Sequence, residues 1–500
     1  MMLLSQAAQV LGGKLIGRDV LFTAVSSDSR VIVSGDLFIA LQGENFDGSE
    51  FVAGAAQSGA VAALVNAASY RGAEPPCPLL LVEDTRLALG RLAAHWREQF
   101  AIPLVAVTGS NGKTTVKEML ASILRTHVER GLDKPQAKQG QGGKEAATRH
   151  TVDGRRGTDD EANTGIAQHV AWNAVLATQG NLNNDIGMPL MLLKLRAAHR
   201  YAVIEMGMNH PGEIDYLTRL ARPDVAIVNN AGSAHLAGLG SVEAVARAKG
   251  EIFAGLPENG FAVINADDAH APLWRKLAGA HAVIEFGMER HVAVHAQWQP
   301  QGHGAHIEAS TPQGGFSANL QVPGVHNVRN ALAATAAALA LHIPLPDIAA
   351  GLEKFPGVGG RLQRKAALHG AVLIDDSYNA NPASLHAALK VLAQVSGKKI
   401  LVLGDMGELG AAAVRLHGEI GAEARRMGVD QLLALGEMTA HTVHEFGSGA
   451  RHFERIEDLL AALDKDMDAD STVLVKGSRF MRMERVVRYC TGQEETCCSH

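Results

Sequence analysis

The chain of 500 residues is poor in cysteine and in aromatic residues, and neither charge predominates. Its four cysteines are too few for a disulfide framework and show no zinc-binding spacing, and three of them, Cys490, Cys497 and Cys498, are expected in a polar tail, so we expect the cysteines to be incidental. There are 46 basic and 52 acidic residues. This balance argues against nucleic acid or an anionic membrane as the main partner and favours a smaller, specific ligand.

Long apolar runs are also absent. No stretch reaches the roughly 18 apolar residues of a membrane-spanning helix, and residues 1–5 lack a basic region and a cleavage signature. We therefore expect a cytoplasmic protein with no stable membrane insertion. Hydrophobic residues nevertheless make up 47% of the chain, which is ample for buried cores, and the length suggests about three domains.

The most informative stretch is an apolar strand that leads into a glycine loop, with the sequence Leu-Val-Ala-Val-Thr-Gly-Ser-Asn-Gly-Lys-Thr-Thr at 104–115. Gly109 and Gly112 permit a tight turn whose N–H groups point at phosphate oxygens, Lys113 adds positive charge, and the Thr114 hydroxyl can ligate Mg²⁺. The general pattern has its first glycine six residues before the lysine, where this chain has Val107. The sequence thus predicts a nucleotide-phosphate site with a shortened loop.

Strand-like and helix-like segments alternate along the chain, which predicts an α/β fold with three domains. We expect a small α/β domain at 1–100, a central domain with a parallel sheet and the phosphate loop at 101–355, a Rossmann-like domain at 356–490, and a tail at 491–500. Strands are expected near residues 201–206, 224–228, 261–264, 372–374, 399–403, 431–435 and 472–475. In the third domain, helices are expected at 383–395, 411–427 and 456–463.

One segment of the central domain differs from its surroundings. Residues 128–171 are rich in Gly, Lys, Gln, Asp and Thr, poor in apolar residues and without periodicity. We expect a disordered or loosely attached insertion there.

The phosphate loop and the motifs behind it resemble the Mur ligase and folylpolyglutamate synthase superfamily of ATP-dependent amide-forming enzymes. The motifs follow the family's order over nearly the whole chain. The ordered set is therefore far more specific than any single motif. The loop at 108–115 is followed by seven further motifs. They are Gly-Asn-Leu-Asn-Asn-Asp-Ile-Gly-Met-Pro at 180–189, Val-Ile-Glu-Met-Gly-Met at 203–208, Ala-Gly-Ser-Ala-His at 231–235, Ala-Arg-Ala-Lys-Gly-Glu-Ile at 246–252, His-Asn-Val-Arg-Asn-Ala-Leu at 326–332, the segment from Pro356 to Arg361, and Asp-Asp-Ser-Tyr-Asn-Ala-Asn-Pro at 375–382.

The resemblance implies an ATP site made by two domains. On the central domain it assigns Thr108, Gly109, Ser110, Asn111, Gly112, Lys113, Thr114 and Thr115 to the phosphates, and Asn327 and Asn330 to the adenine edge. Arg361 and Asp376 would meet the phosphates and ribose when the C-terminal domain closes.

The resemblance also implies two Mg²⁺ ions held by Thr114, Glu205, His235 and a carbamylated Lys249. Glu205 ends an apolar strand, where ligands gather in open parallel sheets. Carbamylation converts the Lys249 amine into an anion and requires a lowered pKa. We expect Lys113, Lys249, His235 and Glu205 to be the catalytic residues.

In the first domain, Ser27, Asp28, Ser29 and Arg30 precede Gly-Asp-Leu-Phe-Ile-Ala-Leu-Gln-Gly-Glu-Asn-Phe-Asp-Gly at 35–48. Together they resemble the UDP-binding module of Mur ligases that act on UDP-muramoyl peptides, which folylpolyglutamate synthases lack. The resemblance implies that residues 27–30 contact the uridine and pyrophosphate. It places Asn181, Asn183 and Asn184 at the substrate as well.

The third domain narrows the expected reaction. It lacks the Asp-Asn-Pro-Arg signature of the family's diaminopimelate-adding enzyme and carries Leu-Gly-Asp-Met-Gly-Glu-Leu-Gly at 403–410 and Val-Lys-Gly-Ser-Arg at 475–479. These resemble the member that adds D-alanyl-D-alanine to UDP-N-acetylmuramoyl-tripeptide through an acyl phosphate, in the synthesis of the peptidoglycan precursor. We expect a monomer.

Two alternatives remain open at this stage. One is the Mur ligase that adds the diamino acid, diaminopimelate or lysine. The other is a non-catalytic ATP-binding protein that senses muramoyl peptides, although intact Lys113, Glu205 and Lys249 argue against it. The base for the attacking amine is not identified: His417 is a candidate, but a place on the helix surface or at a cap is the expectation.

Overall fold

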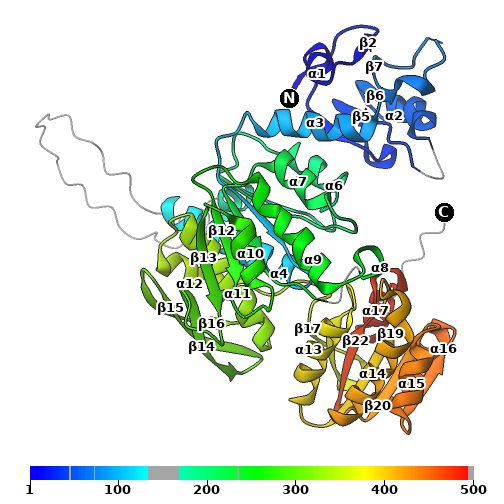
Figure 1. Ribbon diagram of the computed structural model, residues 1–500. Helices are drawn as coiled ribbons and strands as arrows, with labels where there is room; N and C mark the ends of the chain where they lie inside the picture. Colours follow the sequence, from blue (N-terminus) through cyan, green and yellow to red (C-terminus); the bar gives the residue numbers. More distant parts are fainter. Residues whose placement is uncertain (44–46, 73, 133–167, 233–235, 494–500) are drawn as a thin grey trace, which may run out of the picture.

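The structure is a computed structural model that describes residues 1–43, 47–72, 74–132, 168–232 and 236–493. Three α/β units follow one another along the chain, each built around its own sheet (Figure 1). This arrangement confirms the predicted three-domain α/β fold. Among the described residues, no helix is long and apolar enough to cross a membrane.

The N-terminal unit holds a five-stranded sheet in the order β2-β7-β6-β5-β4, and only β2 is antiparallel to its neighbour. Its last helix, α3 (Thr85–Arg97), begins where the Asp84 carboxylate accepts from the backbone N–H groups of Arg86 and Leu87. The other elements are β1 (Met2–Leu3), α1 (Leu4–Leu11), β2 (Lys14–Ile16), β3 (Leu21–Phe22), β4 (Ala24–Ser26), β5 (Asp36–Ile39), α2 (Val52–Gln57), β6 (Ala62–Asn66) and β7 (Leu79–Val82).

The central unit contains a nine-stranded sheet in the order β16-β15-β14-β13-β12-β11-β8-β10-β9. Its strands are parallel from β9 to β14, whereas β14, β15 and β16 pair antiparallel and extend one edge. The strands are β8 (Leu104–Thr108), β9 (Val175–Ala177), β10 (Tyr201–Glu205), β11 (Val225–Val228), β12 (Phe261–Asn265), β13 (Ala282–Gly287), β14 (Val294–Gln301), β15 (Gly304–Thr311) and β16 (Gly314–Leu320).

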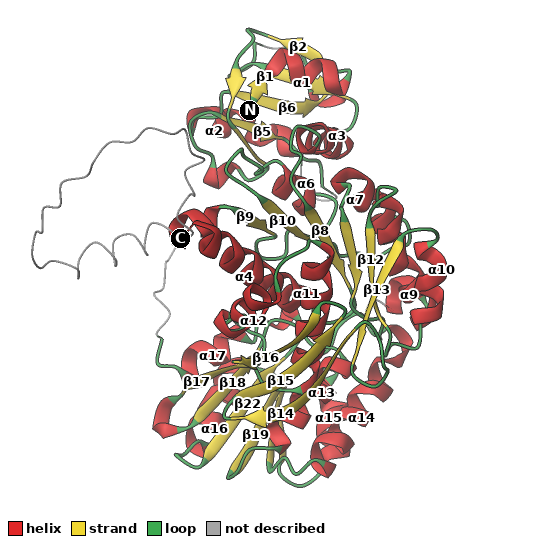
Figure 2. Cartoon of the chain, turned by 90° about the vertical axis from the view of Figure 1, so that its left-hand side faces the viewer, coloured by secondary structure: helices red, strands yellow, loops and turns green. Residues whose placement is uncertain are grey.

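Helices cover both faces of this sheet, as the buried parallel strands require (Figure 2). Alternate side chains of β8 enter two cores: Leu104 and Ala106 join a cluster that also contains one of the N-terminal unit's two cores, and Val105 and Val107 join one against α4 and α11. The helices are α4 (Lys113–Leu132), α6 (Gly187–Leu192), α7 (Glu213–Ala221), α8 (Leu236–Leu239), α9 (Val242–Gly250), α10 (Ala271–Ala278), α11 (Val325–Ala340) and α12 (Leu345–Lys354).

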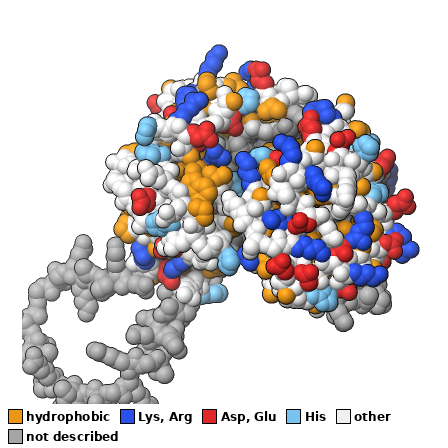
Figure 3. Space-filling view, turned by 90° about the horizontal axis from the view of Figure 1, so that it is seen from below, with side chains coloured by type: hydrophobic (Ala, Val, Ile, Leu, Met, Phe, Trp, Pro, Cys, Tyr) orange, Lys and Arg blue, Asp and Glu red, His pale blue; other side chains and the backbone are white. Residues whose placement is uncertain are grey.

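The C-terminal unit has a six-stranded sheet in the order β17-β18-β22-β19-β20-β21, parallel except for β17. Its two cores are separate from those of the other units. Its strands are β17 (Gln363–Ala366), β18 (Val372–Asp376), β19 (Lys398–Gly404), β20 (Gln431–Leu435), β21 (Ala450–Phe453) and β22 (Ser471–Lys476). Its helices are α13 (Pro382–Ala393), α14 (Ala413–Arg426), α15 (Thr439–Phe446), α16 (Ile456–Asp466) and α17 (Glu484–Cys490). Seen from below (Figure 3), basic and acidic side chains are intermixed on the exposed surface.

Three expectations need correction. The insertion was placed too widely at 128–171, because α4 continues to Leu132 and buried Val128 packs with Ala171 and Ala174. Residues 133–167 of that segment lie outside the described residues. Cys490 is fully buried in α17 rather than part of a polar tail, and burial raises the pKa of its thiol to about 12. The antiparallel strands β14 to β16 were not expected.

Candidate active site

The phosphate loop joins β8 to α4 and needs glycine at its last position. Gly112 has a φ of +79°, a left-handed conformation that favours glycine. A Cβ there would lie 2.4 Å from Asn330 Oδ1 and 2.6 Å from Asn229 Nδ2, which are themselves hydrogen-bonded at 3.0 Å. Asn330 lies in α11, so the loop rests against a buried helix. Only a residue without a side chain fits at this point.

Two asparagines at the end of β11 hold the loop's backbone. The Asn111 N–H donates to Asn230 Oδ1 at 2.8 Å, and the side-chain amides of Asn229 and Asn230 donate to the Asn111 carbonyl at 2.9 and 3.0 Å. Sequence reasoning missed both asparagines. The available signal was a pair of polar residues directly after an apolar strand, at the edge of the sheet where ligands bind.

Lys113, Thr114 and Glu205 come together where α4 begins. Lys113 Nζ donates to the Gly109 carbonyl at 2.8 Å, and Thr114 Oγ1 donates to Glu205 Oε2 at 2.9 Å. The other carboxylate oxygen of Glu205 accepts from Asn183 Nδ2 at 2.8 Å, and the residue is 3% exposed. A hydroxyl and a carboxylate oxygen in contact beside a phosphate loop are the hard donors that suit Mg²⁺.

Lys249 is a buried lysine that interacts electrostatically with Lys113 and Glu205. Lys249 lies in the last turn of α9 and is 1% exposed. Its pKa lies well below the ordinary lysine value, first because burial removes water from the ammonium group and then because Lys113 repels its charge, with Glu205 opposing the shift. Burial also lowers the pKa of Lys113. The predicted metal-binding residue His235 lies outside the described residues.

Lys117, which was not predicted from the sequence, is connected to Glu205 through Thr178. Lys117 Nζ donates to the Thr178 carbonyl at 2.5 Å, and Thr178 Oγ1 accepts from the Glu205 backbone N–H at 2.8 Å. Lys117 is 2% exposed, one turn along α4 from Thr114. Its local sequence gave no sign of this role, because a lysine in a helix is usually solvated.

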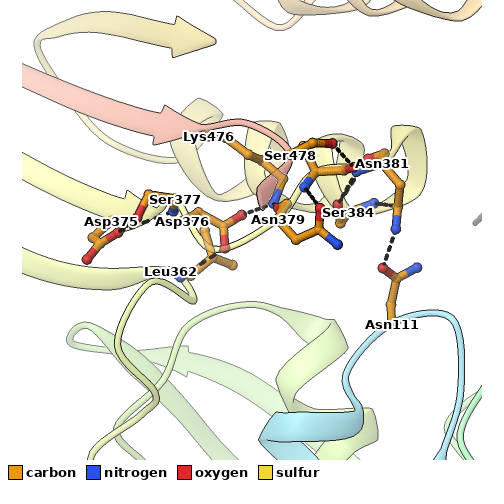
Figure 4. Close-up of polar contacts among 11 residues, drawn as sticks. Asn111, Leu362, Asp375, Asp376, Ser377, Asn379, Asn381, Ser384, Lys476 and Ser478 are labelled. Atoms are coloured by element: carbon orange, nitrogen blue, oxygen red, sulfur yellow. Dashed lines mark hydrogen bonds and ion pairs between the residues drawn. The ribbon is translucent and has the colours of Figure 1, made fainter. Parts of the chain in front are cut away.

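Two side chains of the C-terminal unit reach the phosphate loop. Arg361 donates to Thr114 Oγ1 at 3.2 Å, and its guanidinium lies 4.5 Å from the centre of the Tyr378 ring. Asn381, the N-cap of α13, donates to Asn111 Oδ1 at 2.8 Å (Figure 4). The C-terminal unit is therefore closed onto the phosphate loop in this structure.

Asp376 lies at the end of β18 and is tied to its own unit. Its carboxylate pairs with Lys476 Nζ at 2.5 Å and accepts from the Leu362 backbone N–H at 3.2 Å (Figure 4). Burial raises the pKa of Asp376, and the Lys476 charge opposes that shift. The side chain thus links the segment after Arg361 to the end of β22.

The predicted pair Asn327 and Asn330 lies on one face of α11, with each side chain 5% exposed. Asn330 Nδ2 donates to Asn327 Oδ1 at 3.2 Å, and Asn327 Nδ2 donates to the Pro323 carbonyl at 2.8 Å. Beside them, burial and the nearby charges of Lys476 and Arg329 lower the pKa of His326 to about 4. This neutral imidazole was not among the expected site residues, although it belongs to the same motif.

A cleft of about 1100 Å³ runs between the central and C-terminal units. Its walls include Ser110 to Lys113, Glu205, Arg361 and Asp376, together with the three predicted asparagines Asn181, Asn183 and Asn184. Residues 27–30 do not line it. They form a turn of the N-terminal unit in which Arg30 pairs with Asp28 at 2.8 Å and lowers the pKa of that carboxyl to about 2.

His417 is neither a catalytic base nor a helix-surface residue, the two roles considered from the sequence. Its side chain is fully buried in α14, so it is not a helix-surface residue, and it does not line the cleft, so it is not placed to act as a base. Both ring nitrogens contact backbone groups of the protein: Nε2 lies 2.9 Å from the Met406 nitrogen, and Nδ1 lies 2.8 Å from the Ala413 carbonyl oxygen.

These features define an enzyme that binds a nucleotide on a phosphate loop and closes a second α/β unit over it. Family models match three segments in order: the Mur ligase family catalytic domain at 21–97, the Mur ligase middle domain at 107–338 and the Mur ligase glutamate ligase domain at 360–479. The chain belongs to the Mur ligase family, and it is an ATP-dependent ligase.

Individual relatives cover almost the full length. The UDP-N-acetylmuramoyl-tripeptide–D-alanyl-D-alanine ligases of Escherichia coli K12 and Haemophilus influenzae are each 40% identical, over 97% and 96% of both chains. A crystal structure of MurF from Acinetobacter baumannii is 35% identical with a TM-score of 0.81, covering 97% of each chain. MurF from Thermotoga maritima in complex with ADP is 26% identical with a TM-score of 0.75, covering 95% of this chain and 99% of that one.

Proposed function

We propose that the protein joins D-alanyl-D-alanine to UDP-N-acetylmuramoyl-tripeptide at the expense of ATP, forming the UDP-muramoyl-pentapeptide precursor of peptidoglycan. The observation that carries the proposal is the phosphate loop closed by Arg361 and Asn381 across the cleft, in a chain whose relatives of nearly equal length carry that activity in their names. The units divide the work: 1–100 binds the UDP-muramoyl substrate, 101–355 binds ATP, and 356–490 closes on ATP and receives the dipeptide.

The nucleotide lies on the loop from Thr108 to Thr115. Lys113 neutralises charge on the phosphates, and Arg361 adds a second cation from the closing unit. Asn327 and Asn330 lie within reach of the base at the start of α11, and Asp376 braces the closed unit through Lys476. The contact of Arg361 with Thr114 supports this arrangement, because it brings the guanidinium to the phosphate side of the cleft.

The residues present suit Mg²⁺. Thr114 and Glu205 supply oxygen ligands already in contact, and His235 is expected to supply a nitrogen ligand. The low pKa of Lys249 supports carbamylation, because only the neutral amine adds to CO₂; the product is an anion with two oxygens beside Glu205 and Lys113. Bound Mg²⁺ would supply charge stabilisation to the transferred phosphoryl group.

The chemistry must make a carboxylate electrophilic. The terminal carboxylate oxygen of the tripeptide attacks the γ-phosphorus of ATP, which releases ADP and leaves an acyl phosphate. The neutral amine of the dipeptide then attacks the acyl carbon; the new C–N bond forms as the C–O bond to phosphate breaks, the nitrogen loses one proton to solvent, and inorganic phosphate leaves. Lys113 and Arg361 stabilise the charge that develops on the phosphoryl oxygens.

The substrate side of the proposal rests on other residues. Asn181, Asn183 and Asn184 line the cleft, and Asn183 donates to Glu205, which supports a role for their amides at the reacting end of the tripeptide. Ser27 to Arg30 would meet the uridine and pyrophosphate of the same substrate. The Arg30 guanidinium is exposed and pairs with the neighbouring Asp28 carboxylate, so an incoming pyrophosphate can compete for it.

A substrate panel tests the proposal. Purified protein is supplied with ATP, Mg²⁺ and UDP-N-acetylmuramoyl-tripeptide, and phosphate release is measured separately with D-alanyl-D-alanine, D-alanine, lysine and diaminopimelate. Release that depends on the dipeptide, with a pentapeptide product of the corresponding mass, is expected. Release only with a diamino acid would assign the protein to a different step, and ATP binding without any release would favour a sensor.

A further inference from the structure

The ring of His417 holds a defined protonation state. Because the Met406 nitrogen is a hydrogen-bond donor, Nε2 must present its lone pair, and the ring proton must lie on Nδ1, where it is donated to the Ala413 carbonyl. Burial lowers the pKa of His417, and the charge of His441 lowers it further; the Ala413 hydrogen bond and Asp405 oppose the shift. A proton added at Nε2 would break the bond to Met406.

The bond to Met406 fixes the loop that follows β19. The next residue, Gly407, donates its N–H to Ser478 Oγ at 2.8 Å, and the Ser478 N–H donates to the Asp405 carbonyl at 3.0 Å. Ser478 Oγ in turn donates to the Ala380 carbonyl at 3.1 Å. These contacts join the carboxyl ends of β18, β22 and β19, three adjacent strands of the C-terminal sheet.

The loop also carries a strained residue into the cleft. Glu408 has a φ of +62°, a left-handed conformation that is strained in a residue other than glycine, so the conformation persists only where its surroundings impose it. The anchored N–H groups of Met406 and Gly407 immediately precede it. Gly407 and Glu408 both line the cleft, on the unit that faces the phosphate loop.

We propose that His417 is a positioning residue for the acceptor: its neutral ring holds residues 405–408 as the wall against which the incoming dipeptide lies. This inference rests on the proposed function. ATP lies on the central unit, so the acceptor amine must approach the acyl phosphate from the opposite wall, at the carboxyl ends of the C-terminal strands. Disorder in this loop should therefore weaken binding of the acceptor more than binding of ATP.

Three variants test the role. His417→Leu removes the acceptor for the Met406 N–H; His417→Gln keeps an oxygen near the position of Nε2 but cannot titrate; His441→Gln, on the exposed face of α15, is the matched control. KM for the dipeptide, KM for ATP, kcat and thermal unfolding are measured for each. We expect His417→Leu to raise the dipeptide KM roughly tenfold, as loss of one buried hydrogen bond would, while the ATP KM changes less than about twofold. His417→Gln and His441→Gln should stay near the wild type.

The pH profile separates positioning from simple packing. As pH falls through the lowered pKa of His417, the dipeptide KM of the wild type should rise relative to that of His417→Gln, and the ratio of the two cancels the protonation of the dipeptide itself. An unchanged dipeptide KM in folded His417→Leu, or an equal rise in the ATP KM, would overturn the inference, as would a ratio independent of pH. A wild type that releases no phosphate with the dipeptide would instead count against the proposed function.

Discussion

Replacing Gly112 by alanine tests the close approach on which the phosphate loop depends. The new Cβ would lie 2.4 Å from Asn330 Oδ1 and 2.6 Å from Asn229 Nδ2, and the φ of +79° disfavours alanine. The left-handed backbone costs about 1 to 2 kcal/mol, and separating the buried asparagine pair costs about 1 to 3 kcal/mol more. The sum, about 2 to 5 kcal/mol, corresponds to a factor of roughly 30 or more in an equilibrium constant.

This cost is divided between ATP affinity and the stability of the fold, so both must be measured. Isothermal titration with ATP and Mg²⁺ gives the affinity, and thermal unfolding without nucleotide gives the stability. Gly131→Ala is the matched control, because Gly131 lies in α4, the helix that follows the loop, and among the described residues no atom outside the helix's own backbone lies within 4 Å of the added Cβ. If Gly112→Ala matched Gly131→Ala in both measurements, the tight fit between the loop and α11 would be refuted.

Further predictions concern charge, pH and the insertion. Lys249→Ala should abolish phosphate release at every bicarbonate concentration, and a wild-type rate would refute the carbamate. Asp376→Asn should lower the melting temperature because it leaves the buried Lys476 charge without its counter-charge, at a cost of about 3 kcal/mol or more; adding Lys476→Met should recover most of the loss. His326 has a pKa of about 4 in the fold against 6.5 unfolded, so the unfolded chain binds more protons between these values; the free energy of unfolding should therefore fall as the pH is lowered through that range, and it should fall less steeply in His326→Leu than in the wild type. Exchanging residues 133–167 for a short glycine-serine linker should change turnover only modestly, because Val128 of α4 packs with Ala171 and Ala174 on the other side of the segment; a large loss would give the segment a role in catalysis.

Much of the site follows from local sequence. Glycine spacing and the strand before Gly109 predict the phosphate loop, and Glu205 could be placed because it ends an apolar strand. These residues carry their information within a few positions of the chain. Arg361, from the C-terminal unit, could be associated with the loop only through the order of family motifs, and the contact of Asn381 with Asn111 was not predicted.

The remainder depends on contacts between distant segments. Lys117 is buried because Thr178 and Glu205 lie behind α4, and nothing in its own helix indicates this. His417 is buried because small neighbours in α14, Gly418 and Gly421, let the helix approach α15 closely; a Cβ on Gly421 would lie 2.1 Å from the Thr442 carbonyl. The strands β14 to β16 were not predicted, because their Gly, Gln and His residues obscure the alternation of apolar and polar residues that indicates a half-buried strand.

The hydrophobic core that runs from the N-terminal unit into the central one has a consequence for how the molecule comes apart. One cluster of buried side chains includes residues of both units, between Met2 and Ala278, and α3 contacts α1 of the N-terminal unit and α6 and α7 of the central one, whereas the C-terminal unit shares no cluster with either. The three units therefore amount to two cooperative ones. In calorimetry, the C-terminal unit should unfold in one transition, and the N-terminal and central units should unfold together in another. A nucleotide that bridges the cleft should reduce the difference between the two melting temperatures.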